Sequence, residues 1–425
     1  MQHMPRRLMP ALIALAFSGT AAASGFQLIE QNASGIGNAY AGSAAVAENA
    51  STIFYNPAGM TQLQAREFSL GISAVRPSFN FSNNGSVIPG GPGITSFSGN
   101  GGDGGSWAFL PNGYLSWALN KDLYVGVGFG APFGLMTEYD DNWLGAAQSI
   151  KFDIKTYNIN PTIAYRVNDK VSIGLGLNWQ KMDIEYQKRL TTIASSPLGV
   201  VPIATLTADD TSWGWNIGAL FTVSPTTKVG VSYRSTVNYT LDGNLTAPAS
   251  LYSGGAAVAL PVKADIKLPD TFIVSVTQQL NDRWTMLGDI SWTGWSNIPK
   301  VDILRKSDGA LVQRLDTAFK DSWRIALGAN YQLNNAWKLK FGVAYDNTPV
   351  PDPEHRLVSL PDNDRTWVTF GAQWKPSKEG TLDIGLAYLF VKDTDINAVS
   401  SGTYAVKGSY DSNVKILGAQ YSRSF

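Results

Sequence analysis

The sequence alternates apolar residues with polar or small ones over many segments of strand length. In the clearest segment, apolar residues alternate with Ser, Gly and Asn; the apolar residues are Val171, Ile173, Leu175, Leu177 and Trp179. The same period of two recurs in residues 123–129, 338–345 and 382–388. A period of two gives a β-strand one apolar face and one polar or small face. The pattern therefore predicts an all-β chain.

The connections between these segments are alternately short and long. Six are tight turns with the Asn, Asp and Pro residues that such turns favour, near residues 120–121, 168–169, 224–227, 281–282, 334–335 and 376–379. Seven are polar or rich in Gly and Pro, near residues 78–106, 132–151, 188–210, 243–262, 304–318, 347–363 and 393–410. Thirteen connections join fourteen strands. An even strand number with short turns at one end and long loops at the other is typical of a transmembrane β-barrel, with both termini in the periplasm.

A soluble β-sandwich or propeller is the alternative fold. The membrane barrel is favoured by aromatic residues near predicted strand ends, as expected at membrane interfaces: Trp107, Trp117, Trp143, Trp179, Trp292, Trp295 and Trp374. The chain also ends in a predicted strand, residues 414–425, with an aromatic last residue. Such an end resembles the signal read by the outer-membrane assembly machinery. We therefore predict a 14-stranded antiparallel transmembrane β-barrel over residues 66–425, in the outer membrane of a Gram-negative bacterium.

Residues 1–23 have the features of a secretory signal peptide. Arg6 and Arg7 precede an apolar run over residues 8–17, and three alanines at 21–23 form a small-residue cleavage site. Two of the 33 basic residues, Arg6 and Arg7, lie in this leader. The rest of the chain therefore has 31 basic residues against 33 acidic ones. This balance lacks the basic excess of a nucleic-acid-binding protein. The chain contains no Cys, so an exported protein of this length forgoes disulfides.

The segment between the leader and the first predicted strand, residues 24–65, is rich in Ala, Gly, Ser and Asn. It has neither the charge of a disordered tail nor the apolar face of a long helix. Small residues suit close packing, and the lumen of a fourteen-stranded barrel is wide enough to need filling. We predict that residues 24–65 form a plug, or hatch. Within it, Asn56 and Pro57 would fix a turn where the plug meets the barrel wall.

Several motifs carry a family resemblance. GFQL at 25–28, SGIGNAYAG at 34–42 and NPA at 56–58 resemble the N-terminal hatch of the FadL family of outer-membrane long-chain fatty acid transporters. The likeness continues through FKDSWRIALG at 319–328 and LPDNDRTW at 360–367. The resemblance implies a monomeric fourteen-stranded barrel in outer-membrane lipid and lipopolysaccharide. It also implies passive uptake of a hydrophobic ligand and no cofactor.

The resemblance also suggests residues for an inner ligand pocket. A fatty acid needs an apolar groove for its tail, and its carboxylate needs a cation or hydrogen-bond donors. In the matching segment KMDIEYQKR, Ile184 takes an apolar wall position, and Tyr186 stands where the family carries an arginine. Lys188 lies on the same face and could substitute for that arginine, or Tyr186 could donate a weaker hydrogen bond. In LVQR, Arg314 takes the place of a lysine; the alternative is that Lys188 and Arg314 are solvated charges at the bases of loops.

Two further features complete the expected pathway. Pro132, followed by Phe133 and Gly134, should kink or open the third strand, because Pro cannot donate to a sheet. In the family such a kink makes a lateral gap into the membrane; the alternative is that the strand simply ends at Gly130. The loops near 188–210 and 243–262 are unusually apolar, which is typical of a capture site for ligand. Hatch movement near Phe26 and residues Asn56, Pro57 and Ala58 would then connect the pocket to the gap.

Three other functions compete with fatty acid uptake. An enzyme is disfavoured, because His355 is the one His outside the leader and no nucleophile motif accompanies it. A general water-filled porin is disfavoured by the N-terminal segment and the apolar loops. The family also includes importers of monoaromatic hydrocarbons, which remain the alternative because Tyr186 replaces the family arginine.

Overall fold

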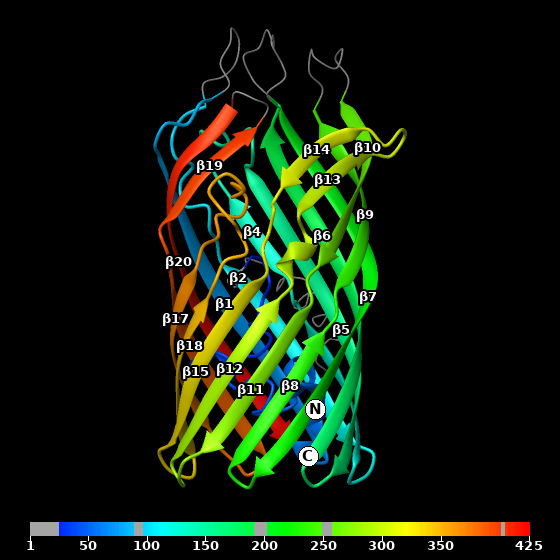
Figure 1. The fold of residues 1–425 in the computed structure, drawn as a ribbon, viewed down its shortest axis with the longest axis vertical. Coiled ribbons are helices and arrows are strands. Elements are labelled where there is room, and N and C mark those ends of the chain that lie inside the picture. Colours follow the sequence, from blue (N-terminus) through cyan, green and yellow to red (C-terminus); the bar gives the residue numbers. More distant parts are fainter. Residues whose placement is uncertain (1–24, 89–96, 191–201, 249–256, 401–403) are drawn as a thin grey trace, which may run out of the picture.

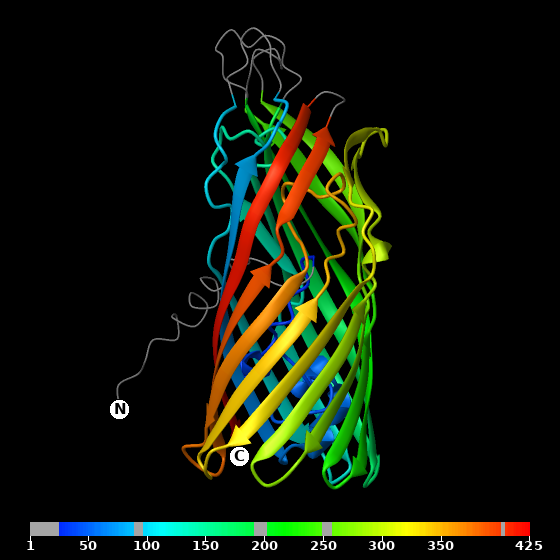
Figure 2. The ribbon, with the colours of Figure 1, turned by 60° about the vertical axis from the view of Figure 1, so that its left-hand side comes forward.

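The protein is a closed β-barrel in the computed structural model, which describes residues 25–88, 97–190, 202–248, 257–400 and 404–425 (Figure 1). Its strand segments are β1 (Arg66–Asn83), β2 (Ala108–Ala118), β3 (Leu123–Gly130), β4 (Gly134–Glu138), β5 (Lys151–Asn168), β6 (Val171–Arg189), β7 (Ile203–Ser224), β8 (Thr227–Arg234), β9 (Val237–Ala247), β10 (Val258–Leu268), β11 (Thr271–Gln279), β12 (Trp284–Thr293), β13 (Lys300–Arg305), β14 (Leu311–Asp316), β15 (Ser322–Gln332), β16 (Trp337–Asp346), β17 (Arg365–Trp374), β18 (Gly380–Val391), β19 (Thr394–Ser400) and β20 (Tyr404–Ser424). All their pairings are antiparallel, and β1 pairs with β20 to close the ring, so that blue and red strands lie side by side in Figure 2.

Six spans of the barrel are interrupted, so that two segments make one crossing: β3–β4, β8–β9, β10–β11, β12–β13, β14–β15 and β18–β19. Counting each pair once gives fourteen spans over the described residues, as the sequence predicts. The six tight turns also fall where they are predicted, and the C-terminus lies at the short-turn end (Figure 1).

Most of the long loops are shorter than predicted, although the loop predicted at 347–363 is found between the end of β16 at Asp346 and the start of β17 at Arg365. β6 continues to Arg189 and β7 begins at Ile203, inside the loop predicted at 188–210. In the same way, β9 and β10 enter the loop predicted at 243–262, and β14 occupies part of the loop predicted at 304–318. β7 has 22 residues, which at about 3.3 Å each exceed the roughly 30 Å hydrocarbon core more than twofold. Its end beyond the membrane has a polar outer face, and such sequence is easily taken for a loop.

The outer face carries the apolar residues of the alternating pattern. Exposed residues on eight of the fourteen spans include Ile163, Leu175, Ile217, Val274, Leu327, Val343, Val368 and Leu386. Exposed aromatic residues lie nearer the strand ends, among them Trp107, Trp117, Trp323, Trp337 and Trp374. Such a band with aromatic borders is typical of a barrel in a membrane. In the described residues no helix is long and apolar enough to cross a bilayer.

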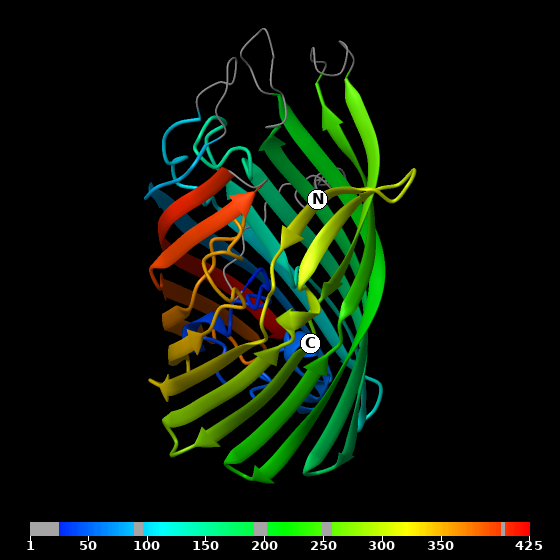
Figure 3. The same ribbon diagram turned by 45° about the horizontal axis from the view of Figure 1, so that its top comes forward.

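Residues 25–65, which we call the luminal segment, lie inside the barrel (dark blue in Figure 3). They form the short helices η1 (Ile36–Asn38), α2 (Thr52–Tyr55) and η2 (Pro57–Gln62), joined by turns. Wall glycines let the segment approach closely: a Cβ on Gly230 would lie 1.9 Å from the Ala44 carbonyl oxygen. The signal peptide predicted over residues 1–23 lies outside the described residues.

Candidate functional site: an apolar cavity beside a break in the wall

The barrel wall is interrupted in its third span. β3 ends at Gly130 and β4 begins at Gly134, and Pro132 between them has no N–H to donate. β3 pairs with β2 and β5, whereas β4 pairs with β5 alone, so the first five residues of β2, 108–112, pair only with β1. Sheet pairing is therefore missing here on one side of β4. The kink predicted at Pro132, Phe133 and Gly134 falls at this break.

The luminal segment covers the break from inside. The Leu28 N–H donates to the Pro132 carbonyl at 2.8 Å, and the Gly134 N–H donates to the Phe26 carbonyl at 2.9 Å. Gln27 and Phe133 thus form an antiparallel bridge. One turn further on, the Gln31 side chain donates to the Ala131 carbonyl at 2.7 Å and accepts from its N–H at 3.1 Å. The inner lining of the break and the start of the luminal segment are therefore one hydrogen-bonded unit.

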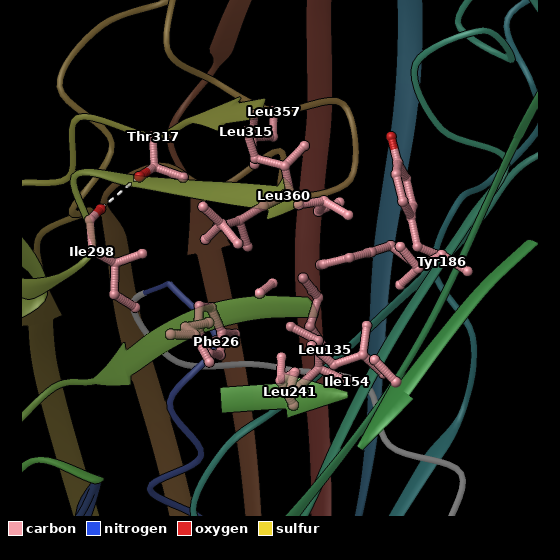
Figure 4. Close-up of a pocket in the computed structure, with 18 of the residues that line it drawn as sticks. Phe26, Leu135, Ile154, Tyr186, Leu241, Ile298, Leu315, Thr317, Leu357 and Leu360 are labelled. Atoms are coloured by element: carbon pink, nitrogen blue, oxygen red, sulfur yellow. Dashed lines mark hydrogen bonds between the residues drawn. The ribbon is translucent and has the colours of Figure 1, made fainter. Parts of the chain in front are cut away.

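An apolar cavity lies beside this unit. Phe26 forms part of its lining and contacts the rings of Phe133 and Trp295, at 6.0 and 4.8 Å between centroids. Figure 4 shows side chains from distant spans pointing toward the shared space: Leu135 of β4, Ile154 of β5, Tyr186 of β6, Leu241 of β9, Leu315 of β14, and Leu357 and Leu360 of the loop after β16. Nearly every lining group is hydrocarbon. We call this space the upper cavity.

Two of the predicted pocket residues line the upper cavity, and a third lies next to them. Ile184 and Tyr186 are lining residues. The Tyr186 hydroxyl donates to the Gln148 carbonyl and accepts from the Gln313 amide at 3.1 Å, so its donor is already used. Lys188 is the next residue on the same face of β6 and is half-buried. No hydrogen bond or ion pair involves its ammonium group within the part of the chain that the structure describes.

Arg314 lies further from the cavity. Its guanidinium donates to both carboxylate oxygens of Asp302, at 2.5 and 3.0 Å, and its side chain is 46% exposed. Asp302 also pairs with Lys300 at 3.0 Å. Arg314 is absent from the cavity lining, although the next residue, Leu315, contributes to it.

The turn at Asn56 joins the luminal segment to the wall. The buried Asn56 amide donates to the Ala44 carbonyl at 2.7 Å and to the Ala219 carbonyl of β7 at 2.9 Å. Its side-chain oxygen accepts from the Ala58 N–H and so caps η2, in which Pro57 takes the first position. Both Pro57 and Ala58 are buried against wall glycines.

Two glutamates of the luminal segment are buried in opposite electrostatic settings. Glu48 pairs with Lys338 and Lys340, each at 2.9 Å. Burial alone would raise the pKa of Glu48, but these two charges outweigh it and hold the pKa well below its usual value. Glu30 is fully buried, and neither of its carboxylate oxygens has a hydrogen-bond partner among the described residues. Burial raises the pKa of Glu30 to about 7, against the weaker opposite effect of its own backbone, Arg365 and Arg324.

Sequence reasoning missed most of the upper cavity. Its lining includes Leu206 and Ala208 of β7 and Val262, Ala264 and Ile266 of β10. In residues 262–266 the apolar Val, Ala and Ile alternate with the charged Lys263 and Asp265, which was a usable signal, but that stretch begins within a predicted loop. Of the apolar loop residues predicted to capture ligand, those in 191–201 and 249–256 lie outside the described residues.

A closed membrane barrel with a filled lumen and an apolar cavity defines a class: channels that carry hydrophobic small molecules across the outer membrane. The comparisons with known proteins place the chain within this class. It belongs to the family described as outer membrane protein transport protein (OMPP1/FadL/TodX), whose model matches residues 14–425. The chain is thus an outer-membrane transporter of hydrophobic compounds, and its family consists of transport channels rather than enzymes.

Relatives cover most of the chain. Outer membrane protein P1 of Haemophilus influenzae is 31% identical over 94% of this chain and 93% of its own length. The long-chain fatty acid transport protein of Escherichia coli O157:H7 is 28% identical over 91% of this chain and 92% of its own length. Among solved structures, a Pseudomonas aeruginosa FadL homologue superposes with a TM-score of 0.85 at 22% identity, covering 95% of this chain and all of that one. The Pseudomonas putida toluene transporter TodX gives a TM-score of 0.67 at 15% identity, covering 93% and 98% of the two chains.

Proposed function

We propose that the protein takes up long-chain fatty acids by passive, ligand-gated diffusion. The observation that carries this proposal is the apolar upper cavity together with Lys188, the next inward-facing residue of β6 after the lining residue Tyr186, whose ammonium group is unpaired among the described residues. Each CH₂ group moved from water into such a cavity contributes about 0.8 kcal/mol, so an acyl chain supplies most of the affinity. The relatives named as long-chain fatty acid transport proteins support the same ligand class.

Lys188 is the proposed contact of the carboxylate. A buried ionic head group needs a counter-charge, and Lys188 stands one inward position above Tyr186, which lines the cavity. Arg314 is proposed as a second, outer contact, because a ligand there must compete with Asp302 for the guanidinium. The extracellular loops after β6 and β9 would capture ligand before it enters the cavity.

The luminal segment is proposed to act as the hatch. A ligand in the upper cavity meets Phe26, whose carbonyl accepts from Gly134 in the break of the wall. Displacement of Phe26 would therefore loosen the segment that covers the break. Ligand would then leave sideways past Pro132 into the outer leaflet, down its own gradient.

Uptake of monoaromatic hydrocarbons is the alternative function. It is favoured by a single observation: the donor of Tyr186, at the position of the family arginine, is already bonded to Gln148. A hydrocarbon needs no head-group contact, so it would bind in the same cavity without using Lys188.

Binding of oleate and of toluene to the purified barrel tests the proposal. We expect oleate to bind, Lys188→Ala to weaken it about tenfold, and Arg314→Ala to weaken it less, with oleyl alcohol unaffected by either substitution. Lys181→Ala is the matched control, since this lysine of the same strand already pairs with Asp183 at 2.8 Å. Toluene binding without any preference for oleate, and with no effect of Lys188→Ala, would move the protein to the hydrocarbon alternative.

A further inference from the structure

A second space lies on the other side of Phe26. This lower chamber is lined by residues of the luminal segment and of β8, β11, β12, β15 and β16. Phe26 lines the upper cavity and the adjacent Gln27 lines the lower chamber. The Gln27 amide donates to the Thr271 hydroxyl at 2.9 Å, and its oxygen accepts from the Thr293 hydroxyl at 3.1 Å. A partition about one residue thick therefore separates the two spaces.

The chemistry of the lower chamber differs from that of the upper cavity. Two guanidinium groups line it, Arg234 of β8 and Arg324 of β15, against one carboxylate, Asp346. The lining residues thus carry an excess of one positive charge. Hydroxyl groups of β8, β11, β12 and β15 surround the arginines, and Leu28 and Ile273 add apolar surface. A space with excess positive charge, hydroxyl donors and apolar patches suits the head group of an anionic amphiphile.

Arg324 has hydrogen-bonding capacity to spare. Its side chain is 7% exposed, and its Nε–H has no hydrogen-bond partner among the described residues. A buried donor without a partner is costly, so a ligand oxygen that accepts from it would gain the full strength of a charge-assisted bond. This guanidinium also donates a hydrogen bond from Nη2 to the Ala39 carbonyl of the luminal segment.

We infer that the lower chamber is a second ligand site, which takes the carboxylate of an acyl-chain acid at Arg324 and Arg234 after Phe26 has moved aside. This inference rests on the proposed function, because the acid reaches the chamber from the upper cavity. The second site gives the head group a place to go while the chain leaves the upper cavity. The lower chamber would thus be an intermediate binding site for the carboxylate on its way out of the upper cavity.

The competing role of the two arginines is purely structural. Arg234 donates to the Phe54 carbonyl at 2.9 Å and stacks on the Phe54 ring at 4.2 Å, so both arginines hold the luminal segment to the wall. Arg166 of β5 offers a matched control. It donates to the Thr61 carbonyl of the same segment but does not line the chamber. A merely structural role predicts that Arg166→Gln and Arg324→Gln act alike.

Photo-crosslinking of the full-length barrel tests the inference. The probe is laurate with a diazirine beside its carboxylate, compared with the matching alcohol, and labelled peptides are located by mass spectrometry. We expect carboxylate-dependent labelling of residues 291–293 and 322–324, stronger in Phe26→Ala. Arg324→Gln should lower it at least tenfold, Arg324→Lys should retain part of it, and Arg166→Gln should leave it unchanged.

Ser291→Leu tests whether any loss of labelling in Arg324→Gln comes from a loosened luminal segment instead of a lost carboxylate contact. Ser291 lines the chamber, so the leucine fills the space without removing a contact to residues 25–65, and we expect the same loss of labelling. Labelling confined to upper-cavity peptides, such as residues 152–154 and 262–266, in both wild type and Phe26→Ala would overturn the second site and leave the proposed function standing. Equal labelling by the acid and the alcohol at every peptide would overturn both.

Discussion

Glu30 should make docking of the luminal segment depend on pH. Its carboxyl is fully buried without a hydrogen-bond partner among the described residues, and burial raises its pKa from 4.5 to about 7. The charged groups that act on it are Arg365 of β17, Arg324 of β15 and Asp346 of β16. In a released segment the same carboxyl meets water and returns to its ordinary pKa.

The direction and the size of this pH dependence follow from the linkage between proton binding and docking. Between the two pKa values the docked state binds the proton and the released state does not, so docking is favoured at low pH and weakens as the pH rises. One pKa unit corresponds to about 1.4 kcal/mol, so release becomes easier by about 2.5 kcal/mol from about pH 5 to about pH 8. This is roughly a 60-fold increase in the released population. Glu30→Gln keeps the size of the side chain and removes the titration, so it should abolish this dependence.

Hydrogen–deuterium exchange of peptides from residues 25–62 measures the effect, expressed as protection relative to the intrinsic exchange rate at each pH. Glu48→Gln is the control in the same segment. Glu48 is already ionised at both pH values because Lys338 and Lys340 hold its pKa well below the usual range. This substitution should therefore lower protection equally at both. Equal protection of the wild type at the two pH values, or an unchanged pH dependence in Glu30→Gln, would refute the reasoning.

Three further perturbations address the same segment. Asn56→Ala removes one hydrogen bond to β7 and two within the luminal segment, which together should destabilise the docked segment by about 2–3 kcal/mol and raise exchange in residues 44–62. Exchange unchanged from wild type would contradict the assigned junction. Gly230→Val places side-chain atoms against the Ala44 carbonyl, so the segment should fail to dock and single-channel conductance should rise; wild-type conductance would show that the contact is dispensable. Gln27→Cys with Phe133→Cys joins bridge partners in a chain without native Cys, and oxidation should block uptake until a reductant is added; uptake that persists in the oxidised form would separate gating from the break.

The strand count could be predicted because inside–outside alternation is a local signal. Residues 171–179 show one apolar face and one face of small or polar residues, and this pattern does not depend on which strands pair. Strand ends could not be predicted in the same way. In residues 205–211 of β7 the outer face is polar, since a strand of 22 residues extends beyond the membrane core. There the side chains still alternate between the two faces, but the outer face is no longer apolar, so the alternation does not identify a strand.

The upper cavity could be predicted only in part, because its lining is assembled by closure of the barrel. Ile184 and Tyr186 belong to one recognisable segment, whereas Val262 of β10 and Leu360 of the loop after β16 reach the same space from far away in the sequence. Arg314 illustrates the limit for charges. Its register partner on the hairpin is Asp302, and this pairing follows from strand register rather than from the motif that drew attention to Arg314.

The start of the luminal segment couples three parts of the molecule. Phe26 lines the upper cavity, Gln27 lines the lower chamber, and Leu28 bonds to Pro132 at the break in the wall. These residues are consecutive in an extended stretch, so a shift of one backbone unit moves all three contacts together. The two backbone hydrogen bonds to the break are worth about 1 kcal/mol each in net terms, whereas burying three CH₂ groups of a ligand contributes about 2.4 kcal/mol. A ligand that buries only a few more methylene groups when Phe26 is displaced can therefore offset the loss of both bonds, which makes chain length, rather than head-group charge, the property that opens the break.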